Sequence, residues 1–487
     1  MRNSWLRIAL SLFISTSVSA APQVRIQPSF ILGLWSFVST ETGHLTSQAV
    51  QEAYEKSKFH TPENDRHLAE IGEIILENFR EGYYPFHGAA EGREEQSWDV
   101  TAHFDYQAAR SQTLEEFRTR TQGVIPTVKH QQLFQALKTL EPVYDQLIWK
   151  PNLAQLNKDQ MRLESVMKKA DVQNVIQSLI QFYHANWNDA VPFTIMIVPV
   201  PAIKGPTHAT VICDTGLLQI LRNEKNIDSR FGVLVHEIGH SLYSTESPEF
   251  QKEMADWFLK STVPTAKIAY KNWEEVLSTI IGNGWAYEKA AGKPDSDEWY
   301  NNKEYNDLSK ALYPLAKTYL ESKKPLDEDF ARTAIDTFQK LFPDSARRYR
   351  RLLRKVLVVT DGSFGDKLLV KKQLMADRRW IKQYGFASPM SEKETVKAVA
   401  DRGTQGALIL LINPEHQSEL DQFTPLAPEI KILRTLLKSE TGYATAIDPK
   451  GRLTIIIQAK DLADISKALH KIVPDEAASE GPRFYPN

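Results

Sequence analysis

The spacing of apolar residues divides the chain into stretches of different texture. From residue 22 to about residue 160, apolar residues recur every three or four positions, as in 47–57 and 66–79, which is typical of amphipathic helices. The apolar face continues through 163–187 and predicts one long helix there. We therefore expect residues 22–160 to form a helical N-terminal region.

β-branched runs appear after residue 190. The run PFTIMIVPVP at 192–201 is bounded by prolines and predicts a strand, and HATVICDTG at 208–216 is a second strand candidate near a sheet edge. Helical spacing returns at 229–244, where Ser229 is the expected N-cap, and further helical patterns follow. The stretch 161–355 should therefore be a mainly helical domain with a small sheet.

The last third of the chain alternates between strand-like and helical patterns. Buried strands are expected at 356–362 and 407–414, helices near 367–383, 391–402 and 461–472, and a hairpin with an Asp-Pro-Lys-Gly turn at 442–459. These elements predict a small α/β domain over 356–475, followed by a disordered tail over 476–487. The fold class expected for the whole chain is α+β with this appended α/β domain.

The N-terminus has the pattern of a secretory signal peptide. Arg2 and Arg7 precede an apolar stretch at 8–14, and small residues follow up to a cleavage site near Ala20 and Ala21. We expect residues 1–21 to be removed and the protein to be exported, to the periplasm or outside the cell. No later segment reaches 18 consecutive apolar residues, so no stable membrane anchor is expected.

Composition changes this picture little. The chain has 487 residues, 42% hydrophobic and 25% charged, and its formal net charge of −2 gives no indication of nucleic-acid binding. The basic run at 347–355 is typical of a solvated helix face. Cys213 is the one cysteine, which excludes intramolecular disulfides, and its apolar surroundings favour a buried structural thiol.

The chemistry-bearing motif is HEIGH at 236–240. Residues four apart lie on one face of a helix, so His236 and His240 can direct their imidazoles at one metal ion, and zinc accepts such ligands. Glu237 is offset by one residue and is the expected general base for the attacking water. A catalytic zinc site needs a third protein ligand.

Two regions offer that third ligand. The chain does not match a known zinc-peptidase pattern, H-E-x-x-H-x-x-G-x-x-H, because Tyr243 stands at the position of its glycine and Glu246 at that of its last histidine. Glu246 remains an alternative ligand. The second region is the helical pattern WEEVLSTIIG, which carries adjacent glutamates. The periodicity of its apolar residues places Glu274 nearer the apolar face than Glu275.

Here the chain resembles the gluzincin metallopeptidases, the group that includes thermolysin. Their second helix has a pattern like E-A-I-S-D-I-F-G, which EVLSTIIG at 275–282 matches. The resemblance covers roughly residues 160–290 and is limited to short motifs. It implies a zincin-like fold with Glu275 as third zinc ligand, and an edge strand at 208–216 that pairs with an extended substrate. Thr279 stands where the family has a histidine-orienting aspartate.

The resemblance predicts an exported zinc metallopeptidase that hydrolyses peptides or proteins. A catalytically inactive, metalloprotease-like binding protein of the cell envelope is the alternative, but it gives no reason for an intact Glu237. An aspartic-peptidase interpretation of Asp214-Thr-Gly lacks a second such loop. The group that stabilises the transition state stays open among Tyr243, Tyr270, Tyr287 and His208.

Overall fold

A computed structural model describes the chain over 22–42, 47–78, 81–85, 95–365, 370, 381, 383–401, 406–437, 440–474, 476–479 and 481–486. The expected signal peptide over 1–21 lies outside the described residues. The chain divides into two compact units, one formed by Met1–Ser261 and Ala269–Thr337 and the other by Thr262–Ile268 and Phe338–Asn487. Helices predominate and each unit contains a mixed sheet, so the expected combination of helices and sheets is confirmed at this level.

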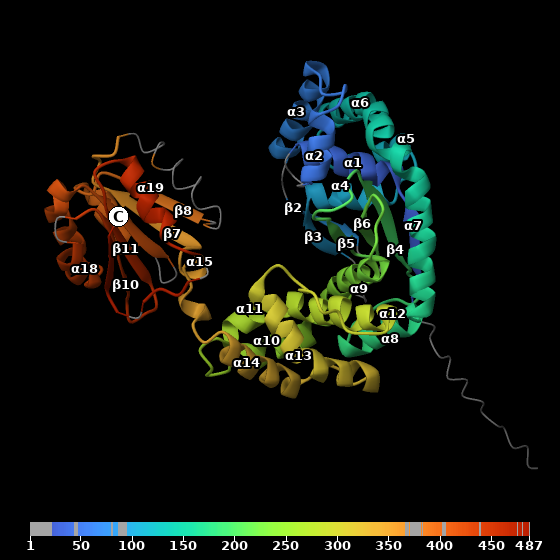
Figure 1. Cartoon of the computed structure of the whole chain (residues 1–487). Helices are drawn as coiled ribbons and strands as arrows, with labels where there is room; N and C mark the ends of the chain where they lie inside the picture. Colours follow the sequence, from blue (N-terminus) through green and yellow to red (C-terminus); the bar gives the residue numbers. More distant parts are fainter. Residues whose placement is uncertain are drawn as a thin grey trace, which may run out of the picture. The chain divides into compact units, whose positions relative to one another are not determined.

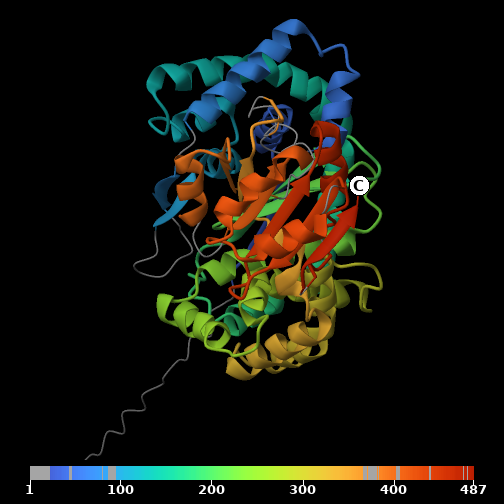
Figure 2. The ribbon, with the colours of Figure 1, turned by 90° about the vertical axis from the view of Figure 1, so that its left-hand side faces the viewer.

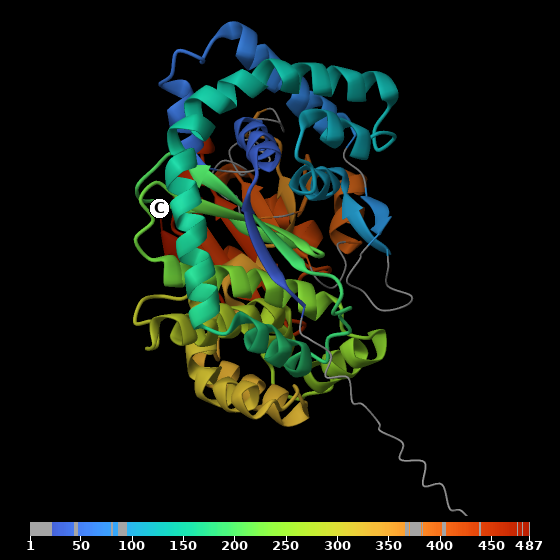
Figure 3. The same ribbon diagram turned by 90° about the vertical axis from the view of Figure 1, so that its right-hand side faces the viewer.

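The sheet of the first unit has the order β1-β4-β6-β5. Strands β1 (Val24–Pro28), β4 (Phe193–Val200) and β6 (Thr215–Leu221) are parallel, and β5 (Ala209–Ile212) runs antiparallel along the edge. Figure 3 shows β1 in dark blue beside the green strands. All of β6 and nearly all of β4 are buried, as expected for parallel strands covered on both faces.

Two predictions about these strands need correction. The segment 208–216 is not one strand: the chain turns at Cys213, whose φ of +58° is left-handed, and β6 begins at Thr215. The strand predicted at 192–201 is confirmed as β4. The N-terminal region is not purely helical, because it supplies β1 and a separate hairpin of β2 (Glu81–Pro85) and β3 (Glu95–Asp99).

Helices make up most of the N-terminal region, and several begin at a hydroxyl N-cap such as Ser29, Thr61 or Thr113. Trp35 and Phe104 stack at 5.2 Å in their common core. The helices are α1 (Phe30–Glu41), α2 (Gln48–Glu55), α3 (Pro62–Glu77), α4 (Val100–Ala109), α5 (Leu114–Arg120), α6 (Thr127–Tyr144), the π-helix η1 (Asp145–Trp149), α7 (Lys150–Lys169) and α8 (Val172–Phe182).

The predicted single helix over 163–187 is wrong, since it is interrupted between α7 and α8. Asp171 has a left-handed φ of +53°, which an α-helix of L-residues does not accommodate. The interruption lets α7 and α8 take different directions while both keep an apolar face buried.

The helix α9 (Ile227–Ser244) covers the face of the sheet opposite α1 and α4 (Figure 1). Met196 and Val198 of β4 belong to the core around α1 and α4, so the alternate residues Ile195 and Ile197 face the α9 side. Asn226, not Ser229, is the N-cap, because the Asn226 Oδ1 accepts from the backbone N–H of Ser229.

The predicted helices between 248 and 355 are confirmed. Those from α10 to α13 lie below α9 in Figure 1. They are α10 (Pro248–Leu259), α11 (Ala266–Thr279), the π-helix η2 (Ile280–Ala286), α12 (Tyr287–Ala291), α13 (Lys303–Ser322), α14 (Glu328–Leu341), the 3-10 helix η3 (Ser345–Arg347) and α15 (Tyr349–Leu352).

The second unit has a six-stranded sheet of order β12-β10-β11-β9-β7-β8, in orange to red in Figure 2. Strands β7, β8, β9 and β11 are mutually parallel, and the β10–β11 pair is the predicted hairpin. The elements are β7 (Lys355–Thr360), β8 (Gln383–Ala387), α17 (Lys393–Ala400), β9 (Ala407–Ile412), the 3-10 helix η4 (Pro414–Phe423), α18 (Glu429–Leu437), β10 (Gly442–Ile447), β11 (Leu453–Gln458), α19 (Leu462–His470) and β12 (Arg483–Pro486).

Most predictions for this unit that fall on described residues are confirmed. Strands at 356–362 and 407–414 and helices at 391–402 and 461–472 are present, whereas the helix near 367–383 falls almost entirely outside the described residues. The disordered tail is wrong: β12 pairs with β10, and the rings of Tyr443 and Tyr485 stack at 4.5 Å. The strand β8 was not predicted.

None of the described helices is long and apolar enough to cross a membrane.

Candidate metal centre

The helix α9 brings both motif histidines to one place. The His236 side chain is buried at 8% exposure, that of His240 is 24% exposed, and the ring centroids lie 4.9 Å apart. This follows from their four-residue spacing, which stacks them one turn apart on the helix.

Glu275 of α11 completes a group of three donors. The Nε2 atoms of His236 and His240 are 3.1 Å apart, and the Glu275 carboxylate lies 3.2 Å from the first and 3.7 Å from the second. One ligand atom from each residue lies within 4.8 Å of the others. Two nitrogens bound to one zinc at tetrahedral angles are ~3.3 Å apart, given Zn–N distances of about 2.0–2.1 Å. This donor set therefore fits zinc.

The two adjacent glutamates take different positions. Glu275 approaches both Nε2 atoms, whereas Glu274 Oε1 lies 3.0 Å from Nδ1 of His240, on the other side of that ring. Burial opposes ionisation of Glu275, but its hydrogen bond with His236 and the two nearby imidazoles outweigh burial and hold its pKa below the usual value. Glu275 is therefore the candidate third ligand, and Glu274 is the candidate for a carboxylate that orients a histidine.

Thr279 does not take over the orienting role of the family's aspartate. Its Oγ1 and the Nδ1 of His236 are both buried, and neither has a hydrogen-bond partner among the described residues. For His240, Ser278 adds a second contact, with its Oγ 3.4 Å from Nδ1. The orienting contacts therefore belong to the second histidine of the motif rather than the first.

Glu237 lies at the edge of the sheet. Its carboxylate accepts a hydrogen bond from the backbone N–H of Val211 in β5. Burial raises the pKa of Glu237 and the adjacent negative charge of Glu275 adds to this, against the opposing effects of the two histidines and of the Val211 N–H. Its position beside the three donors makes this carboxylate the candidate proton acceptor of the site.

Glycines allow the two ligand-bearing segments to approach closely. A Cβ atom on Gly282 of η2 would lie 2.6 Å from the backbone nitrogen of His236, and one on Gly232 would lie 2.9 Å from the carbonyl oxygen of Gly282. On the next turns, Gly239 faces Ser278. These contacts hold α9 and the α11–η2 segment so close together that Glu275 reaches both histidines.

Sequence reasoning missed Tyr300, which lies in the loop before α13. Its hydroxyl is hydrogen-bonded to the Glu275 carboxylate, and its ring is stacked on His236 with centroids 6.4 Å apart and planes at 21°. Burial, followed by the Glu275 charge, raises the pKa of Tyr300, so this hydroxyl stays protonated. Nothing in the local sequence distinguishes Tyr300 from the other tyrosines, because only the fold brings this loop to the site.

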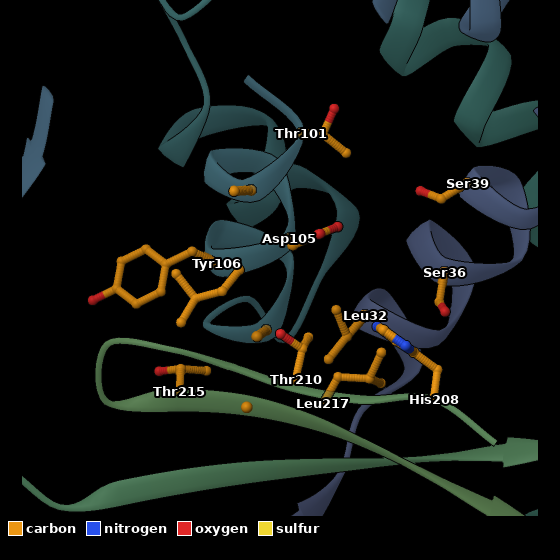
Figure 4. Close-up of a pocket in the computed structure, with 14 residues that line it drawn as sticks. Leu32, Ser36, Ser39, Thr101, Asp105, Tyr106, His208, Thr210, Thr215 and Leu217 are labelled. Atoms are coloured by element: carbon orange, nitrogen blue, oxygen red, sulfur yellow. The ribbon is translucent and has the colours of Figure 1, made fainter. Parts of the chain in front are cut away.

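The other sequence candidates lie elsewhere. Tyr243 packs on Tyr183, Tyr270 packs on Phe258, and Tyr287 is hydrogen-bonded with Asn226. The structure places His208 in a cavity on the α1–α4 side of the sheet (Figure 4). Glu246 is fully buried and forms a backbone bridge with Ala185, outside the group of three donors.

Edge strand β5 is held from both sides at its end. Ser241 of α9 donates a hydrogen bond to the carbonyl of Cys213, and Tyr106 of α4 donates one to Asp214 at 3.0 Å. Cys213 is buried, and burial raises the pKa of its thiol, as expected for a structural cysteine. These bonds fix the β5–β6 turn and thereby the position of Val211 beside Glu237.

Comparisons of the chain with protein-family models, with curated proteins and with solved structures found no match.

Proposed function

We propose that the protein is a zinc-dependent peptidase of the gluzincin type. One observation carries the proposal: His236, His240 and Glu275 converge from two helices, with the Glu237 carboxylate beside them at an open sheet edge. Three protein ligands of this kind leave a position open in catalytic zinc sites, whereas structural sites are closed by four.

The residues of this chain divide the chemistry among them. His236, His240 and Glu275 would hold the ion, which when bound polarises the scissile carbonyl and lowers the pKa of the attacking water. Glu237 takes a proton from that water as its oxygen attacks the carbonyl carbon, and then passes the proton to the leaving amine nitrogen. Glu274 orients His240 through Nδ1.

The edge strand supports a peptide as the substrate. The backbone N–H of Gln219 donates to the carbonyl of His208, so residue 208 is paired with β6, and the alternation of an antiparallel ladder turns Ala209 and Val211 outward. The Val211 N–H that contacts Glu237 is such an outward group. An extended peptide that adds a strand beside β5 would therefore carry a peptide bond past the general base.

The order of elements supports a zincin-like fold for the first unit. Three parallel strands and an antiparallel edge strand are followed by the HEIGH helix, and then by the helix with the third ligand, as the gluzincin resemblance implies. Export to the periplasm or the outside of the cell is part of the proposal and rests on the pattern of residues 1–21.

The test combines metal content with cleavage. The purified protein is expected to hold about one zinc per chain by elemental analysis and to cleave members of a peptide library. Glu237→Gln should retain the zinc and lower kcat by roughly 10²–10⁴-fold, because it removes the general base. Glu253→Gln on the exposed face of α10 is the matched control and should cleave like the unmodified protein. Full activity in Glu237→Gln would refute the mechanism, and lack of zinc binding would refute the site.

A further inference from the structure

Glu275 is the member of the donor group that comes from α11, and its carboxylate offers two oxygens. Oε1 lies 3.2 Å from Nε2 of His236, and Oε2 lies 3.7 Å from Nε2 of His240. A carboxylate can bind a metal ion through one oxygen or through both. Because a glutamate side chain is long and flexible, a further contact has to decide between the two modes.

Tyr300 makes such a contact from outside the donor group. Its hydroxyl is hydrogen-bonded to the Glu275 carboxylate. Its ring is stacked on His236, with centroids 6.4 Å apart and planes at 21°. A phenol has one O–H to donate, so it can hold one oxygen of the carboxylate at a time. A single side chain thus faces two of the three candidate ligands.

The loop that carries Tyr300 is fixed through the residue before it. Trp299 is 6% exposed, its backbone N–H donates to Oδ1 of Asn306 at 2.8 Å, and its carbonyl accepts from Nδ2 of Asn283 at 3.1 Å. A Cβ on Gly284 would lie 2.9 Å from the Trp299 ring, so this ring packs directly on the backbone of η2. Since η2 follows α11 without a break, one continuous segment supports both the loop and the helix of Glu275.

We propose that Tyr300 is a positioning residue that holds one oxygen of Glu275 and leaves the other to bind the metal ion. Hydrogen-bonding partners fix ligating carboxylates in this way. With one oxygen from Glu275 and one nitrogen from each histidine, a tetrahedral zinc site keeps its fourth position for water or substrate. The inference rests on the proposed function and adds to it the group that keeps this position open.

The hydroxyl is the part of Tyr300 that carries this role. Tyr300→Phe removes the hydroxyl and keeps the ring, so the packing on His236 and on Tyr305, whose ring centroid lies 5.1 Å away, is preserved. Without the hydrogen bond the Glu275 carboxylate is no longer held. We therefore expect Tyr300→Phe to bind zinc about 10–100-fold more weakly than the unmodified protein.

The experiment measures the metal rather than cleavage. Zinc affinity is determined by chelator competition, and the visible spectrum is recorded with Co²⁺ in place of zinc. Four-coordinate Co²⁺ absorbs more strongly than five-coordinate Co²⁺, so the bands should weaken in Tyr300→Phe as Glu275 begins to bind through both oxygens. Tyr319→Phe is the matched control, because its hydroxyl donates to the Asp327 carboxylate at 3.0 Å, outside the donor group. It should match the unmodified protein in zinc affinity and in spectrum.

The outcomes separate the inference from the proposed function. Unchanged zinc affinity or an unchanged Co²⁺ spectrum in Tyr300→Phe overturns the inference and leaves the proposed function standing. A lower kcat with unchanged affinity and spectrum also overturns it, because the hydroxyl would then act on the reacting atoms and not on the ligand. An unmodified protein that binds neither zinc nor Co²⁺ refutes the metal site and the proposed function together.

Discussion

Replacing Gly282 by alanine tests whether glycine contacts set the geometry of the candidate metal centre. The added Cβ would lie 2.4 Å from both the Cβ of His236 and the carbonyl oxygen of Gly232, whereas non-bonded carbon contacts are favourable at about 3.5–4.0 Å. The segments must therefore separate locally by ~1.1 Å. The nearest atoms include backbone, which cannot rotate away as the end of a flexible side chain can.

Two effects of this substitution can be measured. Overpacking of this kind costs about 1–3 kcal/mol of unfolding free energy, which urea denaturation would report. Zinc ligands tolerate only about ±0.2 Å, so the displacement of Glu275 relative to His236 should also weaken zinc binding tenfold or more, corresponding to about 1.4 kcal/mol. A chelator competition assay measures that loss.

The matched control is Gly72→Ala on α3. A Cβ there would meet Thr42 at 3.4 Å, an ordinary contact, and alanine in a helix interior is favoured over glycine by about 0.5–1 kcal/mol. This variant should be as stable as the unmodified protein or slightly more so, with unchanged zinc affinity. If Gly282→Ala also unfolds and binds zinc like the unmodified protein, the glycine contacts do not determine the site and the reasoning is refuted.

Further predictions concern the two glutamates and one buried histidine. Glu275→Gln should remove most of the zinc affinity, because it replaces a charged ligand. Glu274→Gln should weaken zinc binding by about 10–100-fold, because it removes the carboxylate that orients His240. A chelator titration in which Glu274→Gln loses more zinc affinity than Glu275→Gln would exchange the roles of the two residues. Burial lowers the pKa of His103 to about 4, while the unfolded chain takes up this proton near pH 6.5. Stability should therefore be full above about pH 6.5 and decrease by about 3 kcal/mol on acidification to pH 4. His103→Leu should flatten that slope in urea denaturation at pH 7 and pH 4.5, and an unchanged slope would contradict the assignment.

Local signals in the sequence predicted the elements whose structure is decided locally. The four-residue spacing of His236 and His240 places them on one helical face whatever surrounds it, and the hairpin at 442–459 carries its own turn residues. Strands β1 and β12 were missed because each is short and pairs with a strand far away along the chain or across a loop. The conformation of such a strand depends on the strand it pairs with as much as on its own residues.

In the candidate site, too, local patterns predicted some residues, and contacts between distant segments decide the others. The apolar periodicity of α11 favoured Glu274, whereas Glu275 is the residue that lies close to both Nε2 atoms once α9 is in place. Tyr300 reaches the site from a loop, where no periodicity constrains a side chain. The helix break at Asp171, which has a left-handed conformation, could not be predicted either, because the apolar pattern continues past it.

The pairing of β1 with β4 has a consequence for how the chain folds. Gln27 contacts Met196 across a separation of 169 residues, so this pair closes a very long loop. Closing it costs roughly 4–5 kcal/mol of chain entropy on a logarithmic scale, and topologies with distant contacts fold slowly. Until β1 docks, β4 presents an unpaired edge that other chains can join. The first few residues after the expected cleavage site should therefore dock late in folding, and their removal by a protease should favour aggregation over a smaller folded fragment.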